Sequence, residues 1–205
     1  MREISLHILD IAENSVAAEA TVITIFVWES GVDNLLSVEI TDNGKGMDAE
    51  TVARVIDPFV TSRTTRIVGL GIPFFKAAAE ACEGELIIQS EPGEGTNVKV
   101  TFAYNHIDRM PLGDLAGTFL SLLVSFPKIN WTFCYRASFY SESNQEVNES
   151  NFNFDNKILI EELVGVSFTE PEVLNYLRCE IYDGLEKALE IPTDMINMEK
   201  TYDYH

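Results

Sequence analysis

The chain has 205 residues, 33 of them acidic and 14 basic, and therefore carries a formal net charge of −19 at pH 7. Hydrophobic residues make up 46%, enough to bury a core, whereas the negative charge disfavours nucleic acid and anionic membrane surfaces as partners. The cysteines are far apart, and the first ten residues lack the apolar run of a signal peptide. We therefore expect a cytoplasmic protein that binds a small molecule or another protein.

An amphipathic helix is predicted at the start of the chain. Apolar residues recur at helical spacing between residues 3 and 18 and form one stripe. At about 100° per residue, Glu3, His7, Asp10 and Asn14 lie on a narrow arc opposite that stripe. This polar arc is either a solvated surface or part of a binding site.

The next segments predict a sheet with helices. Strands are expected at residues 21–28, 36–41, 85–90 and 97–104, and helices at 49–56 and 72–83. Asp48 is the expected N-cap of the first of these helices, and Gly84 the stop of the second. The polar residues 59–68 between the helices indicate a mobile loop.

The composition changes after residue 106. We predict a buried helix at residues 112–126, strands at 129–141 and 152–160 around an acidic, Asn-rich connection, and an amphipathic helix at 170–191. The chain is thus expected to have one domain at 1–106 and an extension at 107–205. The extension either continues the sheet or forms a docking surface, and pairing of its last helix with a second copy of the chain remains open.

The polar arc of the first helix contains a candidate metal ligand. Asparagine has poor helix propensity, so Asn14 requires either a solvated position or a function. Its amide oxygen suits Mg²⁺, a hard cation that prefers oxygen ligands. Asp10, one turn earlier, could then orient or deprotonate an attacking group.

A second candidate segment follows the strand at residues 36–41. Asp42-Asn43-Gly44-Lys45-Gly46 either forms a hairpin turn or contacts a flat ring, and the helix that follows weakens the hairpin interpretation. An ionised Asp42 could accept a hydrogen bond from the exocyclic amine of adenine, while Gly44 and Gly46 let the backbone approach the ring.

Two further glycine segments complete the series. Gly69-Leu70-Gly71 opens a helix, whose free N–H groups and positive dipole end suit phosphate. The preceding residues could fold over the phosphates as a lid; they are Thr61, Ser62, Arg63, Thr65 and Arg66. The segment 93–96 by itself indicates a plain turn. Together with the polar arc of the first helix and the segments at 42–46 and 69–71, however, it forms an ordered series that is far more specific for a nucleotide pocket than any one member.

Five short segments of the chain resemble the N, G1, F, G2 and G3 boxes of the GHKL superfamily. They are Asp10-Ile11-Ala12-Glu13-Asn14-Ser15, Asp42-Asn43-Gly44-Lys45-Gly46-Met47, Asp57-Pro58-Phe59, Gly69-Leu70-Gly71 and Gly93-Glu94-Gly95-Thr96. The superfamily includes DNA gyrase, a heat-shock chaperone, sensor histidine kinases and mismatch-repair ATPases. The resemblance covers about residues 4–102 and implies the Bergerat ATP-binding fold, an α/β two-layer sandwich with a mixed sheet.

The resemblance also implies roles for individual residues. Asp10 would be catalytic, and Asn14 would be the ligand of Mg²⁺. The nucleotide-binding positions would be Asn14, Asp42, Gly44, Gly46, Met47, Phe59, Thr61, Arg63, Arg66, Gly69, Leu70, Gly71 and Thr96. ATP or ADP with Mg²⁺ is therefore the expected ligand.

Two departures from the family pattern shape the expected function. Hydrolytic members carry glutamate at the position of Asp10, and a carboxylate set back by about 1.5 Å could slow water attack by about 100-fold. There is also no helical hairpin with a phosphoacceptor histidine, and a hydrogen-bonded structural role is expected for His7. We expect a kinase-like regulator that phosphorylates or regulates a partner protein; the alternatives are a non-catalytic ATP/ADP sensor and a slow ATPase.

Overall fold

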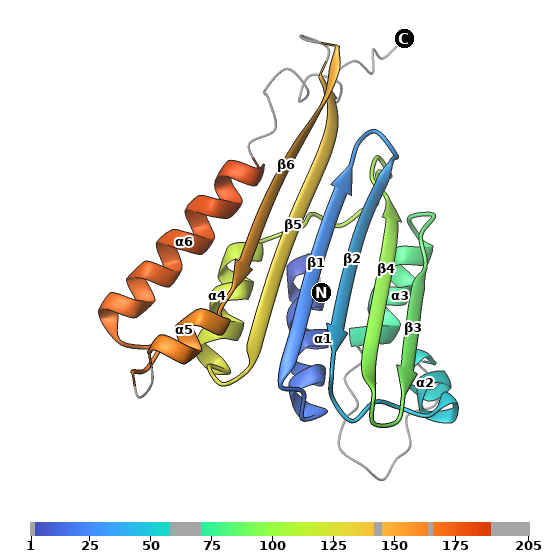
Figure 1. Ribbon diagram of the computed structural model, residues 1–205. Helices are drawn as coiled ribbons and strands as arrows, with labels where there is room; N and C mark the ends of the chain where they lie inside the picture. Colours follow the sequence, from blue (N-terminus) through green and yellow to red (C-terminus); the bar gives the residue numbers. More distant parts are fainter. Residues whose placement is uncertain (1–2, 58–70, 142–144, 164–165, 190–205) are drawn as a thin grey trace.

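The computed structural model describes residues 3–57, 71–141, 145–163 and 166–189. They form an α/β two-layer sandwich, in which helices cover one face of a six-stranded mixed sheet (Figure 1). The elements in chain order are α1 (Ile4–Ala17), β1 (Val22–Ser30), β2 (Leu35–Asp42), α2 (Ala49–Ile56), α3 (Gly71–Glu80), β3 (Leu86–Glu91), β4 (Gly95–Ala103), α4 (Leu115–Ser125), β5 (Asn130–Ser141), β6 (Glu146–Asp155), α5 (Lys157–Glu162) and α6 (Pro171–Leu189).

The sheet runs in the order β3-β4-β2-β1-β5-β6. β1 pairs antiparallel with β2 and parallel with β5, in a register that places Ile25 opposite Ile40 on one side and Phe133 on the other. The extension after residue 106 therefore continues the sheet, which is one of the two arrangements left open by the sequence. The domain division at residue 106 stays a prediction.

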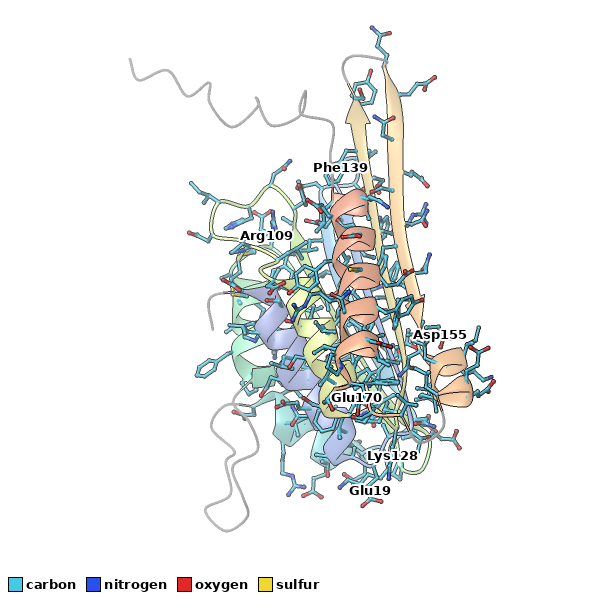
Figure 2. All side chains as sticks on the ribbon, turned by 90° about the vertical axis from the view of Figure 1, so that its left-hand side faces the viewer. Glu19, Arg109, Lys128, Phe139, Asp155 and Glu170 are labelled. Carbon is cyan, nitrogen blue, oxygen red and sulfur yellow. The ribbon has the colours of Figure 1, made fainter. Side chains whose placement is uncertain are left out.

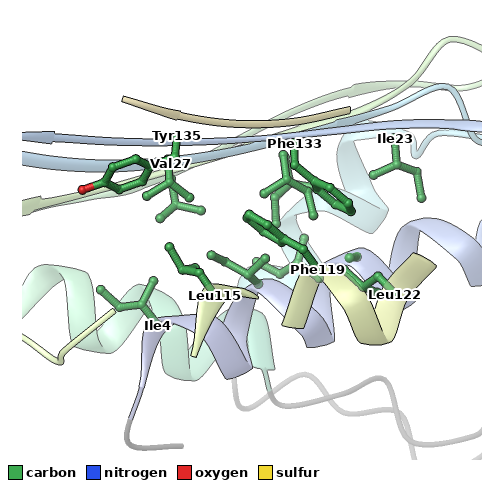
Figure 3. Close-up of a cluster of buried hydrophobic side chains, with 14 of the residues drawn as sticks. Ile4, Ile23, Val27, Leu115, Phe119, Leu122, Phe133 and Tyr135 are labelled. Carbon is green, nitrogen blue, oxygen red and sulfur yellow. The ribbon is translucent and has the colours of Figure 1, made fainter. Parts of the chain in front are cut away.

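The core lies between the sheet and the helices. Alternate residues of β1, namely Ile23, Ile25 and Val27, point at the helices and are fully buried. Phe119 of α4 stacks on Phe133 of β5 with ring centroids 4.3 Å apart (Figure 3). Figure 2, which views the sheet from its edge, shows α1, α3 and α4 together on this side of it.

The N-terminus of α1 is capped by the segment that leads to α4. The N–H of Ile4 donates to the carbonyl of Pro111 at 3.0 Å, and that of Ser5 to Leu112 at 2.8 Å. Glu3, the N-cap residue, supplies no side-chain bond. Since a helix begins with N–H groups that lack partners within it, the extension fixes the start of the helix that carries Asp10 and Asn14.

Two predicted boundaries are wrong. The predicted strand at residues 152–160 is instead β6, which begins at Glu146, followed by α5 from Lys157. α3 ends at Glu80, and Glu83 rather than Gly84 takes the left-handed conformation, with φ 56°. Gly84 is needed for space, since a Cβ there would collide with the carbonyl oxygen of Thr101. Within the described residues, no helix combines the length and hydrophobicity needed to cross a membrane.

Candidate nucleotide-binding site

Asp42 ends β2 with a buried carboxylate. Only 8% of the residue is exposed. Ser15 of α1 donates its hydroxyl to Oδ2 at 2.6 Å, and the N–H of Gly44 donates to Oδ1 at 2.8 Å. These two bonds to donors fix the plane of the carboxylate and offset the cost of burying it.

The loop after Asp42 is fastened to the end of α1. The N–H of Lys45 donates to the carbonyl of Ala18 at 2.9 Å. Gly46 has φ 64°, and a Cβ there would collide with the carbonyl of Glu91. Glycine at position 46 is thus required both by its backbone conformation and by the close approach of the β3–β4 turn.

A second set of hydrogen bonds joins this loop to β3 and β4. Ser90 accepts from the N–H of Met47 at 2.8 Å and donates to the carbonyl of Gly95 at 2.8 Å. The hydroxyl of Thr96 lies 2.9 Å from that of Ser90, and its backbone pairs with Asp42 in the β2–β4 register. The loop, β3 and β4 therefore form one connected floor.

An open cavity of about 740 Å³ lies between α2 and this floor. Its lining is Thr41, Asp42, Ala49, Val52, Ala53, Ile88, Gln89, Ser90, Glu91, Glu94, Gly95, Thr96 and Asn97. Three apolar residues of α2, namely Ala49, Val52 and Ala53, line this space, and no residue of α2 is fully buried. Asp48 caps α2 as predicted, accepting from the N–H of Thr51 at 2.8 Å. An apolar wall opposite a few fixed polar groups is typical of a small-molecule pocket.

Asp10 and Asn14 lie one turn apart on α1. Asn14 is exposed, whereas Oδ2 of Asp10 is a buried oxygen without a hydrogen-bond partner among the described residues. Burial raises the pKa of Asp10. Gly71, the first residue of α3, packs so closely that a Cβ there would collide with the Asp10 carboxylate. The start of α3 thus lies directly against a buried carboxylate oxygen of α1.

His7 points into the interior rather than to solvent. Its ring stacks on Phe75 of α3 with centroids 4.5 Å apart. Burial lowers the pKa of His7 to about 4, and a hydrogen bond to the backbone of Gly71 partly opposes this shift. The polar arc predicted on α1 is therefore not solvent-exposed along its whole length, because α3 covers it at His7. The predicted structural role of His7 agrees with these contacts.

The structure gathers several of the predicted residues in two neighbouring groups. Asp42 and Thr96 line the cavity, whereas Gly44, Gly46 and Met47 belong to the loop after Asp42 and are not part of its lining. Asp10, Asn14 and Gly71 belong to α1 and the start of α3. Six other predicted positions lie outside the described residues; they are Phe59, Thr61, Arg63, Arg66, Gly69 and Leu70.

Two site residues were not predicted. Ser15 and Ser90 hold Asp42 and the loop through their hydroxyls. A signal existed for Ser15, because serine within a helix competes for backbone hydrogen bonds and, like Asn14, requires a reason. Ser90, near the end of a strand, has no comparable local signal.

Comparison with known proteins identifies the family. Residues 2–106 match the model of the histidine kinase-, DNA gyrase B- and HSP90-like ATPase family, and the chain belongs to this family. A putative sensor protein of Shewanella frigidimarina is 34% identical over 98 residues, covering 47% of this chain and 15% of that protein. Sensor protein kinase FleS of Pseudomonas aeruginosa is 38% identical over 89 residues, covering 43% of this chain and 22% of the kinase.

The matched region is thus a small part of each of these longer relatives. A solved structure, the Aquifex aeolicus MutL ATPase domain complexed with ADP, is 15% identical with a TM-score of 0.41. That comparison covers 65% of this chain and 60% of the MutL chain.

Proposed function

We propose that the chain binds Mg²⁺-ATP between α1, α2 and the ends of β2–β4, and passes the γ-phosphoryl group to a partner protein or regulates that protein. The observation that carries the proposal is the buried, ionisable Asp42 at the floor of an open cavity, held by Ser15 and Gly44. Membership of the ATPase family and the sensor kinases among the relatives support it.

The cavity has the chemistry of an adenine site. Val52 and Ile88 provide apolar surface for a flat ring. An ionised Asp42 only accepts hydrogen bonds, so it favours the exocyclic amine of adenine over the carbonyl of guanine. Thr96, beside Asp42, would support the ring directly or through a water.

The residues of α1 fit a magnesium ion. The Asn14 amide and the Asp10 carboxylate are oxygen donors one turn apart, the ligand type that Mg²⁺ prefers. Asn14 would hold the metal, which keeps several waters and phosphate oxygens in its shell. When bound, the ion neutralises charge on the phosphates.

Asp10 is the residue proposed to take up the proton of an acceptor. In the proposed transfer an acceptor oxygen or nitrogen bonds to the γ-phosphorus while the bond to the β-phosphate oxygen breaks, releasing ADP. The carboxylate of Asp10, whose buried Oδ2 has no hydrogen-bond partner among the described residues, would accept the proton that the acceptor loses. Arg63 and Arg66, which precede α3 in the sequence, are proposed to cover the phosphates.

A second candidate function is that of a nucleotide sensor without transfer. Two observations favour it: aspartate replaces the longer glutamate at position 10, and His7 is buried against Phe75, where an incoming phosphate could not reach it. In a sensor, ATP would change the affinity for a partner and remain intact. The partner could be another protein or a second copy of the chain.

Transfer is tested by incubating the protein with γ-labelled ATP and cytoplasmic extract from the source cells, with Asn14→Ala as the control. Label on a protein that depends on Asn14 supports transfer. Nucleotide-dependent partner binding with unchanged ATP supports the sensor instead.

A further inference from the structure

We propose that Ser15 sets the purine selectivity of the site, acting as a positioning residue that holds Asp42 as an acceptor for the adenine amine. This inference rests on the proposed function and deepens it. Ser15 would touch neither the nucleotide nor the metal; it would act through the carboxylate.

The contact between the two side chains is short and shielded from water. The Ser15 hydroxyl lies 2.6 Å from Oδ2 of Asp42, in the range of a strong hydrogen bond from O–H to a carboxylate. Ser15 is 4% exposed and Asp42 8%. Both partners of this hydrogen bond are therefore nearly fully buried.

The second oxygen of Asp42 is held as well. The N–H of Gly44 donates to Oδ1 at 2.8 Å. A carboxylate offers about four lone-pair positions, so these two bonds leave about two for a ligand. Both protein groups donate to the carboxylate, and an ionised carboxylate accepts from an amine and repels a carbonyl oxygen.

The position of Ser15 is itself fixed. Its helix is tied to the loop after Asp42 by the bond from the N–H of Lys45 to the carbonyl of Ala18. Ser15 also follows Asn14 directly in sequence. The residue that orients the purine acceptor and the residue proposed to hold the metal are therefore neighbours in α1.

Selectivity is tested with three nucleotides: ATP, GTP and purine riboside triphosphate, which has the adenine ring without its amine. Dissociation constants are measured with Mg²⁺ for the native chain, Ser15→Ala and Ser15→Thr. Ser5→Ala is the matched control, because Ser5 is also a buried serine of α1 but lies near the opposite end of the helix.

We expect Ser15→Ala to weaken ATP binding about 10-fold, the effect of losing a hydrogen bond to a charged group. The affinity for purine riboside triphosphate should fall by less than about 2-fold, because this nucleotide has no amine to contact Asp42. The ratio of the dissociation constant for GTP to that for ATP should decrease. Ser15→Thr, which keeps a hydroxyl, should retain the preference, and Ser5→Ala should bind all three nucleotides like the native chain.

Equal losses for ATP and purine riboside triphosphate, or no loss for either, would overturn the proposal and leave Ser15 a structural residue. Partial unfolding of a variant would lower its affinity for both nucleotides equally. The unfolded fraction is therefore measured by circular dichroism, and an equal loss overturns the proposal when that fraction is too small to explain it. Failure of the native chain to bind ATP would instead overturn the proposed function.

Discussion

The carboxylate of Asp10 on α1 occupies the space in which a side chain of residue 71 on α3 would begin. This contact joins the helix proposed to hold the metal to the helix start proposed to hold phosphate. A side chain at residue 71 would therefore force the Asp10 carboxylate to move, whether or not a ligand is bound.

Gly71→Ala should lower the free energy of unfolding by about 1–3 kcal/mol, since the added methyl collides with Asp10. Asp10→Ala removes the obstacle. The double variant should therefore recover about 1 kcal/mol relative to the sum of the single changes. Urea unfolding of the four proteins measures this coupling, and strictly additive effects would contradict the contact.

The buried imidazole of His7 should make stability depend on pH. Its pKa falls from 6.5 in the unfolded chain to about 4 in the folded protein. The unfolded chain therefore binds more protons between these values, and stability that is full above pH 6.5 is lost as pH falls towards 4. At about 1.4 kcal/mol per pKa unit, the loss is about 3 kcal/mol.

The variant His7→Phe keeps an aromatic ring against Phe75 and should remove this component of the pH dependence. His106→Gln, in the segment before α4, is the control that should keep it. The difference between native and variant unfolding free energies is measured from pH 7 to pH 4. A difference that stays constant over this range would show that His7 titrates normally.

Tyr135→Phe should destabilise the protein by about 1–3 kcal/mol. The Tyr135 hydroxyl donates to Oε2 of Glu29 at 2.7 Å, and burial raises the pKa of that carboxyl. Without this donor Glu29 would be a buried group lacking a partner that β5 supplies in the native chain. Tyr140→Phe on the same strand, where the residue is 52% exposed, should change stability by less than about 0.5 kcal/mol. Equal effects would mean that the Glu29 contact contributes little.

Hydrolysis of Mg²⁺-ATP by the purified chain should be slow or absent. The reason is the aspartate at position 10. Its carboxylate packs closely against Gly71 and lies one carbon–carbon bond further back than that of a glutamate would. Release of phosphate is measured at steady state for the native chain and Asp10→Asn. Steady turnover that disappears in Asp10→Asn would refute this prediction.

Local signals predicted much of the first half of the fold. The helical spacing before residue 18 and the Asp48 cap placed α1 and the start of α2 correctly. β6 was misplaced because its first residues, Glu146 to Asn151, are polar apart from the exposed Val147 and lack the alternation of a half-buried strand. α5 was missed because its short apolar run, residues 158–160, is typical of the end of a strand.

Contacts between distant residues could not be predicted in the same way. The place of Asp42 at the end of a strand could be predicted locally, but its bond to Ser15 joins residues 27 positions apart. The parallel pairing of β1 with β5, which joins the family domain to the extension, depends on packing across the whole core. Periodicity describes only which face of an element is apolar and does not identify its neighbour.

The most direct test of nucleotide binding at Asp42 is calorimetric titration of the intact chain with ADP or ATP and Mg²⁺. We predict saturable heat at about one nucleotide per chain, and an affinity at least about 10-fold lower in Asp42→Ala, because that variant loses a charged hydrogen-bond acceptor. Absence of heat from the native chain at millimolar nucleotide, or unchanged affinity in Asp42→Ala, would contradict the account.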